Sequence, residues 1–419
     1  MSQRFQVLAL YKRILKIANT WEASVATETV VEREYIRKEA ATKFRQNAKL
    51  TDPAQIEKLI AATEKRIAIG EHYRIPKALR DLAGKVDEIF GSEDESVKKF
   101  VTYYLAGYLP PKHIFEAFIT RLMERPELES LFDPLLCANF IPRPSYEKRI
   151  FKQLVDELEQ REFYDFPILY QRRAMLSDAA ASFTRVFMIW DEPVDAVFIE
   201  EHVNQLSQGT TGLSSWQASY ILANYCKTVL PRFEVGKVLE LGAGCGFTGI
   251  YLSNFLKDID FLLTDGDSNV LRQLESNAVN NDATGTVSVA PLNWIDFEMN
   301  QIADCSVPDV VIGADLVYDP SILPHLTATL STLLHAKSTP IYAFIGCAIR
   351  NEATLAAFLQ QLVEKDVTIV ETVTWTNKTG EFSFEKNDPK FAANYTDSIA
   401  IDTTQTTDVK IFVLKAGQT

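Results

Sequence analysis

A glycine-rich stretch at residues 238–249 combines residue types that could bind a ligand. Its sequence is VLELGAGCGFTG, in which Gly242, Gly244 and Gly246 directly follow a strand-like run. Glycines let a ligand approach the backbone closely, and the helix expected next would aim its N-terminal N–H groups into the same crevice. A second strand-like run, about 20 residues further on, ends in Asp265, whose carboxylate could accept hydrogen bonds from ribose hydroxyls.

Two classes of cofactor fit this pattern. NAD(P) has to be considered because residues 244–249 match the dinucleotide motif GxGxxG. S-adenosylmethionine is favoured because Glu240 lies just before the glycine turn, where a carboxylate suits the cationic ammonium and sulfonium groups of that ligand better than it suits a pyrophosphate. The glycines alone leave both cofactors open.

Short apolar runs alternate with helical stretches after about residue 195. Because these runs are apolar throughout, they predict buried parallel strands and a doubly wound α/β sheet of the Rossmann type. The tail differs, since residues 367–374 and 409–415 are strand-like with no helix between them. They predict a terminal antiparallel hairpin at one sheet edge, with the polar residues 377–407 looping outward. The five predicted buried strands are residues 238–241, 261–264, 287–290, 310–313 and 341–347.

The residues before the sheet are predicted to be all helical. Residues 1–80 show three helical patterns, the third beginning at Asp52-Pro53, where an N-cap residue precedes proline. Residues from about 80 to 190 also have helical spacing, with prolines that divide them into short pieces. We therefore predict three domains: a three-helix module (1–80), a helical region (81–194) and a sheet domain (195–419).

Charge separates the first module from the remainder. The whole chain of 419 residues has a formal net charge of -13, yet residues 1–80 carry a net charge of +7. Such asymmetry suggests two modules with different partners. The acidic remainder argues against duplex nucleic acid as its ligand, since phosphate contacts require clustered Lys and Arg.

Cysteine and histidine usage excludes other classes of protein. The five cysteines form no CxxC pair and the five histidines no HExxH motif, so neither a disulfide framework nor a metal site is predicted. The apolar runs are far shorter than the ~20 residues that a membrane span needs. The start of the chain has no hydrophobic signal segment, which makes secretion unexpected.

Motifs around the glycine turn resemble the seven-β-strand protein-lysine methyltransferases. Before the turn stands QGTTGLSSWQA (208–218), after the third strand LNW (292–294), and at the end of the fourth GADLVY (313–318). Among these enzymes the chain is most similar to the eukaryotic elongation factor 2 lysine methyltransferase family, whose members also have a helical N-terminal region. The resemblance covers roughly residues 95–419.

This resemblance implies S-adenosylmethionine as the cofactor and assigns roles to nine residues. Asp315 and Tyr318 would face the lysine of a protein substrate, Asp265 would hold the ribose, and Trp294 would pack on the adenine. Asp315 would orient the lysine headgroup and Tyr318 would shield it. The implied cofactor-binding residues are Trp216, Gly242, Ala243, Gly244, Asp265, Trp294 and Ala314.

Residues 1–80 resemble a second family, the LYR-motif proteins, which are small three-helix proteins. The resemblance rests on LYKR (10–13), KFRQN (43–47) and IGEHYRI (69–75). It implies binding of mitochondrial acyl carrier protein, and a module of charge +7 with an apolar interior suits an acidic carrier with an acyl tail. The implied contact residues are Tyr11, Lys12, Arg13, Phe44 and Arg45.

Three readings of the whole chain follow. The first is a protein-lysine methyltransferase, acting on elongation factor 2, with an attached LYR-type module. The second is an acyl-carrier-binding adaptor with an idle methyltransferase-like domain, and the third is an NAD-dependent oxidoreductase. The first predicts a cytoplasmic protein, whereas the LYR-type module suggests mitochondria as the alternative. A gene prediction that joins two neighbouring proteins would also explain this pairing.

Overall fold

The computed structural model describes most of the chain in two separate units. They are Met1–Lys85 and Val86–Thr419, so the second unit spans the predicted boundary between residues 194 and 195. No described helix is long and apolar enough to cross a membrane. The described residues are 3–20, 29–47, 50, 52–53, 55–60, 63, 94–132, 143–175, 182–190, 195–204, 210–281, 283, 286–305, 307–392 and 407–417.

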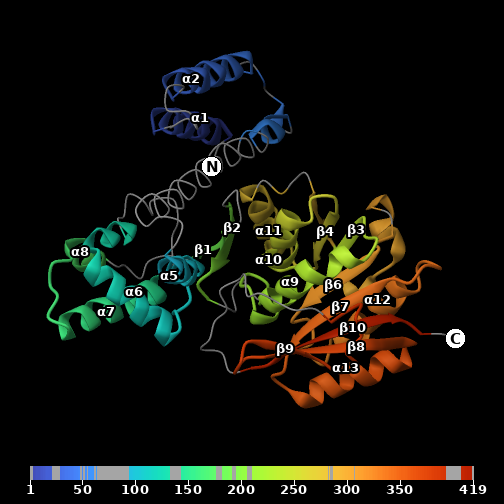
Figure 1. Cartoon of the computed structure of the whole chain (residues 1–419). Coiled ribbons are helices and arrows are strands. Elements are labelled where there is room, and N and C mark those ends of the chain that lie inside the picture. The colour runs from blue at the N-terminus through green and yellow to red at the C-terminus, as the bar shows by residue number, and fades with distance from the viewer. Residues whose placement is uncertain are drawn as a thin grey trace. The chain divides into compact units, whose positions relative to one another are not determined.

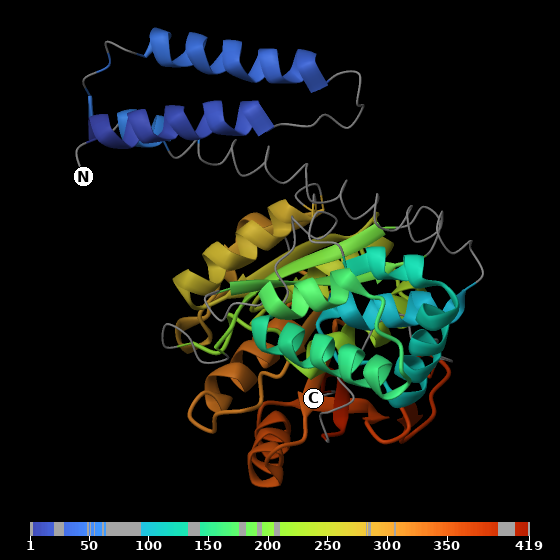
Figure 2. The ribbon, with the colours of Figure 1, turned by 90° about the vertical axis from the view of Figure 1, so that its left-hand side faces the viewer.

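The described part of the first unit contains two packed helices (Figure 2). They are α1 (Gln3–Thr20) and α2 (Thr29–Gln46), joined by a contact between Tyr11 and Phe44 with ring centroids 4.8 Å apart. The side chains of Lys12, Arg13 and Arg45 are exposed. Of the predicted third helix, residues 53, 55–60 and 63 are described and helical. Its other residues and the IGEHYRI motif lie outside the described part of the chain.

The second unit begins with helices packed around an aromatic cluster. Phe100 of α5 stacks on Phe118 of α6 with ring centroids 3.7 Å apart, and Phe132 and Phe151 complete the cluster. All four side chains are buried, so this region has the helical core that its sequence predicts. Its elements are α5 (Glu95–Ala106), α6 (Lys112–Glu124), η2 (Pro126–Phe132), α7 (Pro144–Gln160) and α8 (Pro167–Met175).

A β-hairpin connects these helices to the sheet domain. It consists of β1 (Ser182–Ile189) and β2 (Asp195–His202), paired antiparallel. The helical prediction was wrong for β1, because its side chains pack against α5 and the sheet domain rather than forming one helical stripe. Buried Arg185 donates to Glu201 across the hairpin, with 3.1 Å between Nε and Oε1.

The eight-stranded sheet of the second unit has the order β5-β4-β3-β6-β7-β10-β8-β9 (Figure 1). The first five strands in this order are parallel, which confirms the predicted doubly wound core. The order reverses at β3, so β4 and β6 flank it, and this is where such sheets bind ligands. The parallel strands are β3 (Lys237–Glu240), β4 (Asp260–Asp265), β5 (Val287–Pro291), β6 (Val310–Ala314) and β7 (Tyr342–Ala348).

The C-terminal strands differ from the predicted edge hairpin. They are β8 (Val367–Thr376), β9 (Glu381–Phe384) and β10 (Val409–Ala416). β8 and β10 do pair antiparallel, but β10 is inserted between β7 and β8, and β9 forms the edge. The prediction of a polar loop missed β9, because a four-residue edge strand exposed on one face has no strong apolar signal.

Helices cover both faces of the sheet, because successive strand residues point to opposite faces and both faces are apolar. Val310 and Phe344 contribute to one buried cluster with α9, α10 and α11, whereas Val311 and Ile345 contribute to another with α12 and α13. Strands buried on both sides must be apolar throughout, as the sequence pattern indicated. The helices of this domain are α9 (Gln217–Val229), α10 (Phe247–Phe255), α11 (Ser268–Asn280), α12 (Leu323–Leu334) and α13 (Glu352–Glu364), with short turns η3 (Leu230–Arg232), η5 (Trp294–Asp296) and η6 (Met299–Cys305).

Candidate functional site

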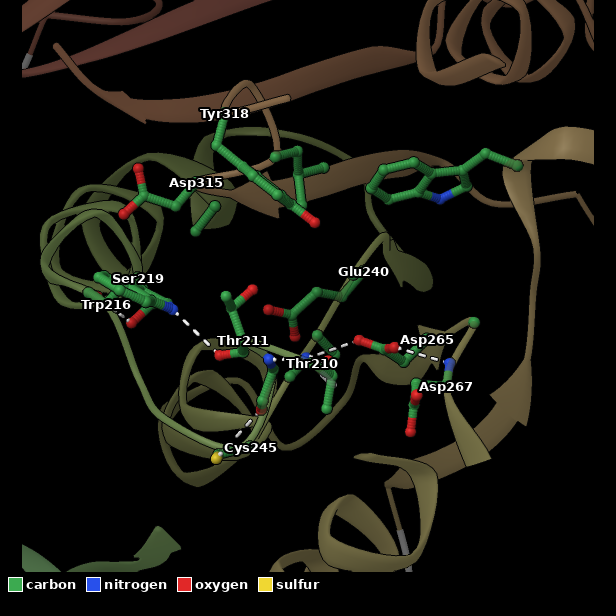
Figure 3. A pocket seen from close by; sticks show the side chains of 18 of the residues that line it. Thr210, Thr211, Trp216, Ser219, Glu240, Cys245, Asp265, Asp267, Asp315 and Tyr318 are labelled. Atoms are coloured by element: carbon green, nitrogen blue, oxygen red, sulfur yellow. Dashed lines mark hydrogen bonds between the residues drawn. The ribbon is translucent and has the colours of Figure 1, made fainter. Parts of the chain in front are cut away.

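A cavity of about 280 Å³ lies where β3, β4 and β6 end, at the point where the strand order reverses (Figure 3). We call two parts of its lining the β3–β4 side, formed by Glu240, the glycine turn and Asp265, and the β6–β7 side, formed by Ala314, Asp315 and Tyr318. All nine site residues predicted from the sequence line this one cavity: Trp216, Gly242, Ala243, Gly244, Asp265, Trp294, Ala314, Asp315 and Tyr318.

The glycine turn on the β3–β4 side has a backbone that only glycine adopts easily. Gly242 and Gly244 have φ values of +57° and +56°, in the left-handed region that is costly for other residues. A Cβ at Gly242 would lie 2.7 Å from Cδ2 of Leu316 and 3.3 Å from Cζ2 of Trp294. The turn is also tied to β4, since the Ala243 N–H donates to the Thr264 carbonyl at 2.8 Å.

Glu240 is buried at the end of β3, and its carboxylate points into the cavity region (Figure 3). Its Oε2 accepts the N–H of Gly249, in the first turn of α10, at 3.0 Å. Burial raises the pKa of Glu240 to about 8, and the charge of nearby Asp265 contributes to this rise. A cationic ligand beside Glu240 would stabilise its ionised form.

Asp265 ends β4 and is held by the backbone. Its Oδ2 accepts the N–H of Gly244 at 3.2 Å, and its Oδ1 accepts the N–H of Asp267 at 3.0 Å. Burial raises the pKa of Asp265 despite these hydrogen bonds. Each carboxylate oxygen can accept a second hydrogen bond, so Asp265 can also bind hydroxyl groups in the cavity.

Two tryptophans border the cavity at different points. Trp294, in η5, lies against the glycine turn, close to the position that a Cβ of Gly242 would occupy. Trp216 precedes α9, and its Nε1 donates to the Thr211 carbonyl at 3.3 Å. The segment from Thr210 to Trp216 therefore closes the cavity on the side facing α9.

Asp315 and Tyr318 form the β6–β7 side. Asp315 follows β6 in the left-handed region, with φ at +55°, and its N–H donates to the Gly346 carbonyl at 2.7 Å. Its Oδ1 accepts the Ala348 N–H and its Oδ2 accepts Nη2 of Arg350, both at 3.0 Å. Tyr318 is 55% exposed, and partial burial raises its pKa, so its hydroxyl stays neutral.

Several residues of the cavity were not singled out by sequence reasoning. Thr211, Gly212 and Asp267 line it, although QGTTG had been noted as a motif and Asp267 directly follows the β4 end. Arg350 contacts Asp315 from the segment between β7 and α13, and no motif marked it. The only available signal was its position just beyond the end of a parallel strand.

The charges of the cavity favour a cationic ligand. Its described lining includes Glu240, Asp265, Asp267 and Asp315 and contains no Lys or Arg. The described part of the chain also contains no cluster of His, Cys, Asp or Glu suited to a metal ion. A pyrophosphate would meet four carboxyl groups here, and the Gly249 N–H that could have bound it is already taken by Glu240.

These residues fit S-adenosylmethionine. The left-handed glycine turn leaves room for a ligand next to the backbone, and Asp265 offers acceptors for ribose hydroxyls. Trp294 offers an aromatic surface beside the turn, and Glu240 provides a carboxylate for a positively charged group. This donor and charge pattern fits a methionine-bearing nucleoside better than NAD(P).

Comparison with known proteins identifies two families in the chain. Residues 197–366 match the lysine methyltransferase family, and residues 5–69 match the LYR family of complex 1 proteins. The zebrafish (Danio rerio) LYR motif containing protein 1 is 48% identical over 75 residues, which are 17% of this chain and 64% of that protein.

Several methyltransferase relatives match part of the chain. Human FAM86B1 is 33% identical over 172 residues, or 38% of this chain, so the chain spans about half (51%) of that relative's length. The human protein-lysine N-methyltransferase EEF2KMT is 26% identical over 290 residues, covering 64% of this chain and 86% of the relative. The protein-lysine N-methyltransferase EFM3 of Chaetomium thermophilum is 25% identical over 259 residues, covering 55% and 77%.

The family match and the cavity lie in the same part of the chain. Residues 197–366 include the glycine turn and both sides of the cavity. Residues 197–366 therefore resemble the lysine methyltransferase family, which together with the cavity points to S-adenosylmethionine as the cofactor, and residues 5–69 resemble the LYR family.

Proposed function

We propose that this protein is a protein-lysine N-methyltransferase that uses S-adenosylmethionine and acts on elongation factor 2. The observation that carries the proposal is the division of one acidic cavity into two parts. The β3–β4 side has the glycine turn and Asp265, which suit a nucleoside, whereas the β6–β7 side has a carboxylate and an exposed tyrosine that suit an amine.

The residues on the β3–β4 side would hold the cofactor. When bound, S-adenosylmethionine supplies a methyl group already activated by its positively charged sulfur. Asp265 would accept hydrogen bonds from the ribose hydroxyls, and Trp294 would pack against the adenine. Glu240 places a carboxylate near the cationic end of the ligand, which favours S-adenosylmethionine over the uncharged sulfur of its product.

The residues on the β6–β7 side would position the acceptor. Asp315 is held rigidly by two backbone hydrogen bonds, so its free lone pairs have a fixed direction for a lysine N–H. Tyr318 covers the amine with its ring, and the ammonium proton leaves to water at the exposed mouth. Holding two reactants in the right relative orientation can lower the activation free energy by several kcal/mol, on the order of 7–11 kcal/mol at best.

Elongation factor 2 is proposed because the chain is similar to the protein-lysine N-methyltransferase EEF2KMT. The alignment with EEF2KMT covers 64% of this chain and 86% of that protein. The acidic cavity is also consistent with a cationic side chain as the acceptor.

A methylation assay tests this function. Purified full-length protein is incubated with elongation factor 2 and isotopically labelled S-adenosylmethionine, and the product is mapped by mass spectrometry. We expect label on one lysine, and none with the Asp315→Asn variant. If another protein is methylated but elongation factor 2 is not, the proposed substrate is wrong. If NAD raises the thermal stability of the protein and S-adenosylmethionine does not, the proposed enzyme class is wrong.

A second activity is proposed for residues 1–80, namely binding of an acyl carrier protein. It is favoured by the LYR-family match and by α1, which buries Tyr11 partly against Phe44 while leaving Lys12 and Arg13 exposed. Full-length protein should capture acyl carrier protein, and charge reversal of Lys12 and Arg13 to Glu should abolish capture. Equal capture by both forms would contradict this binding site.

A further inference from the structure

Arg350 contacts both Asp315 and Trp216. Its Nη2 is 3.0 Å from Oδ2 of Asp315, and its guanidinium carbon is 4.9 Å from the centroid of the Trp216 ring. Asp315 and Trp216 both line the cavity (Figure 3). A carboxylate beside an aromatic face is a favourable site for a cation.

Arg350 is not required to hold Asp315 in place. The Oδ1 of Asp315 already accepts the Ala348 N–H at 3.0 Å, and the backbone N–H of Asp315 donates to Gly346 at 2.7 Å. These two hydrogen bonds fix the residue to the end of β7. The guanidinium therefore adds mainly charge, and it neutralises the carboxylate that the acceptor side offers.

The contact of Arg350 is also suited to displacement. Its side chain is 41% exposed, whereas that of Asp315 is 7% exposed. Ion pairs with one exposed member are weak, since water competes for the charge. Arg350 follows β7 by two residues and precedes α13, so its side chain is attached to a connecting segment and not to a strand.

We propose that Arg350 occupies the ammonium site of the acceptor and is displaced by the substrate lysine. The proposal rests on the proposed function, because it names the part of that site where the lysine headgroup binds. Arginine is suited to this role, since it carries a permanent charge and has no lone pair on nitrogen available for methylation under these conditions. An acceptor therefore binds at Asp315 only if its headgroup is cationic and competes with Arg350 for this carboxylate.

A binding experiment tests this proposal without requiring methyl transfer. n-Butylammonium, which has the headgroup of lysine, is titrated into full-length protein saturated with S-adenosylhomocysteine, and its dissociation constant is measured by ligand-observed NMR. Arg350→Met removes the charge and keeps an aliphatic side chain. We expect about threefold to tenfold tighter binding than in the wild type, the size expected for loss of a partly exposed ion pair and its ring contact.

Two variants serve as controls. Arg173 also pairs with a carboxylate, that of Asp156, at 3.5 Å, and its side chain is likewise 41% exposed; Arg173→Met should bind n-butylammonium as the wild type does. Adding Asp315→Asn to Arg350→Met should remove the gain. Arg350→Gln repeats the test if the methionine variant has a lowered melting temperature.

The outcomes separate this proposal from the proposed function. Unchanged or weaker binding in both Arg350 variants would overturn the displacement role, as would an equal gain in Arg173→Met. In steady-state assays displacement predicts a lower KM for the acceptor with kcat within twofold, whereas a role in positioning Asp315 predicts a lower kcat. Failure of the wild type to methylate any protein would reject the proposed function and leave the n-butylammonium result as the test of Arg350.

Discussion

The two sides of the cavity are built by different means. On the β3–β4 side, Asp265 and Glu240 are fixed by backbone N–H groups, and the glycine turn is tied to β4. On the β6–β7 side, Asp315 pairs with Arg350, whose side chain is partly exposed, and Tyr318 is exposed. A site for one constant cofactor can be rigid, whereas a site for a lysine on a large protein has to admit and release it. Mutations on the β3–β4 side are therefore expected to change cofactor affinity, whereas mutations on the β6–β7 side are expected to change methyl transfer and acceptor binding.

The largest effect is expected for Asp315. Asp315→Asn removes the charge that orients the acceptor amine, so we predict at least a hundredfold lower rate of methyl transfer, equivalent to about 2.7 kcal/mol. Cofactor affinity should stay within about threefold, measured by calorimetry. Asp319→Asn is the matched control, since the carboxylate of Asp319 accepts the N–H of nearby Ser321 and Asp319 does not line the cavity. A large loss of cofactor binding in Asp315→Asn would show that the two sides are not separable.

The next effect concerns the glycine turn. Gly242→Val should weaken cofactor binding by at least tenfold, because the left-handed backbone alone costs about 1–2 kcal/mol and the new side chain would meet Leu316 and Trp294. Gly236→Ala, where a Cβ would have an ordinary contact 3.6 Å from Asp309, should leave affinity unchanged. Calorimetric titration with S-adenosylhomocysteine distinguishes them, and equal affinities would contradict the role of the turn.

A smaller effect is expected from pH on the β3–β4 side. Because burial raises the pKa of Glu240 to about 8, the group is mostly protonated at pH 6 and a cationic ligand must bind to its ionised form. Affinity for S-adenosylmethionine should rise between pH 6 and 8, by less than tenfold per pH unit, and then level off.

The Glu240→Gln variant is the control for this pH dependence. Its affinity should be lower at pH 8 and nearly constant across the range. The stability of the wild type without ligand should also depend on pH. Because the pKa of Glu240 is raised in the native state, protonation of Glu240 favours that state. The wild type should therefore lose stability from about pH 4.5 to 8. If the variant keeps the wild-type slope, Glu240 is not the titrating group.

The smallest effect is expected at the mouth of the cavity. Tyr318→Phe retains the ring and should change kcat and KM less than twofold, whereas Tyr318→Ala should raise the KM for the protein acceptor several-fold. The side chain is 55% exposed, so neither change should lower the melting temperature by more than a few degrees. A tenfold loss in the phenylalanine variant would instead give the hydroxyl a direct role.

Much of the fold follows from local patterns. Strands buried on both faces have to be apolar, so the five parallel strands could be predicted, and so could the position of the glycine turn at the end of β3. The hairpin β1–β2, the edge strand β9 and the insertion of β10 between β7 and β8 could not. Their positions depend on pairing partners far away in the chain, which no local pattern records.

The same division holds for the site. The sequence by itself indicated nine residues of the cavity, because parallel strands end at one edge of the sheet and the flanking motifs resemble a known family. Only the tertiary structure decided their charge state and partners: Glu240 is buried against α10, and Arg350 reaches Asp315 across 35 residues of chain. Burial and long-range ion pairs arise from packing in three dimensions, so the pair of Arg350 with Asp315 has no signature in the sequence.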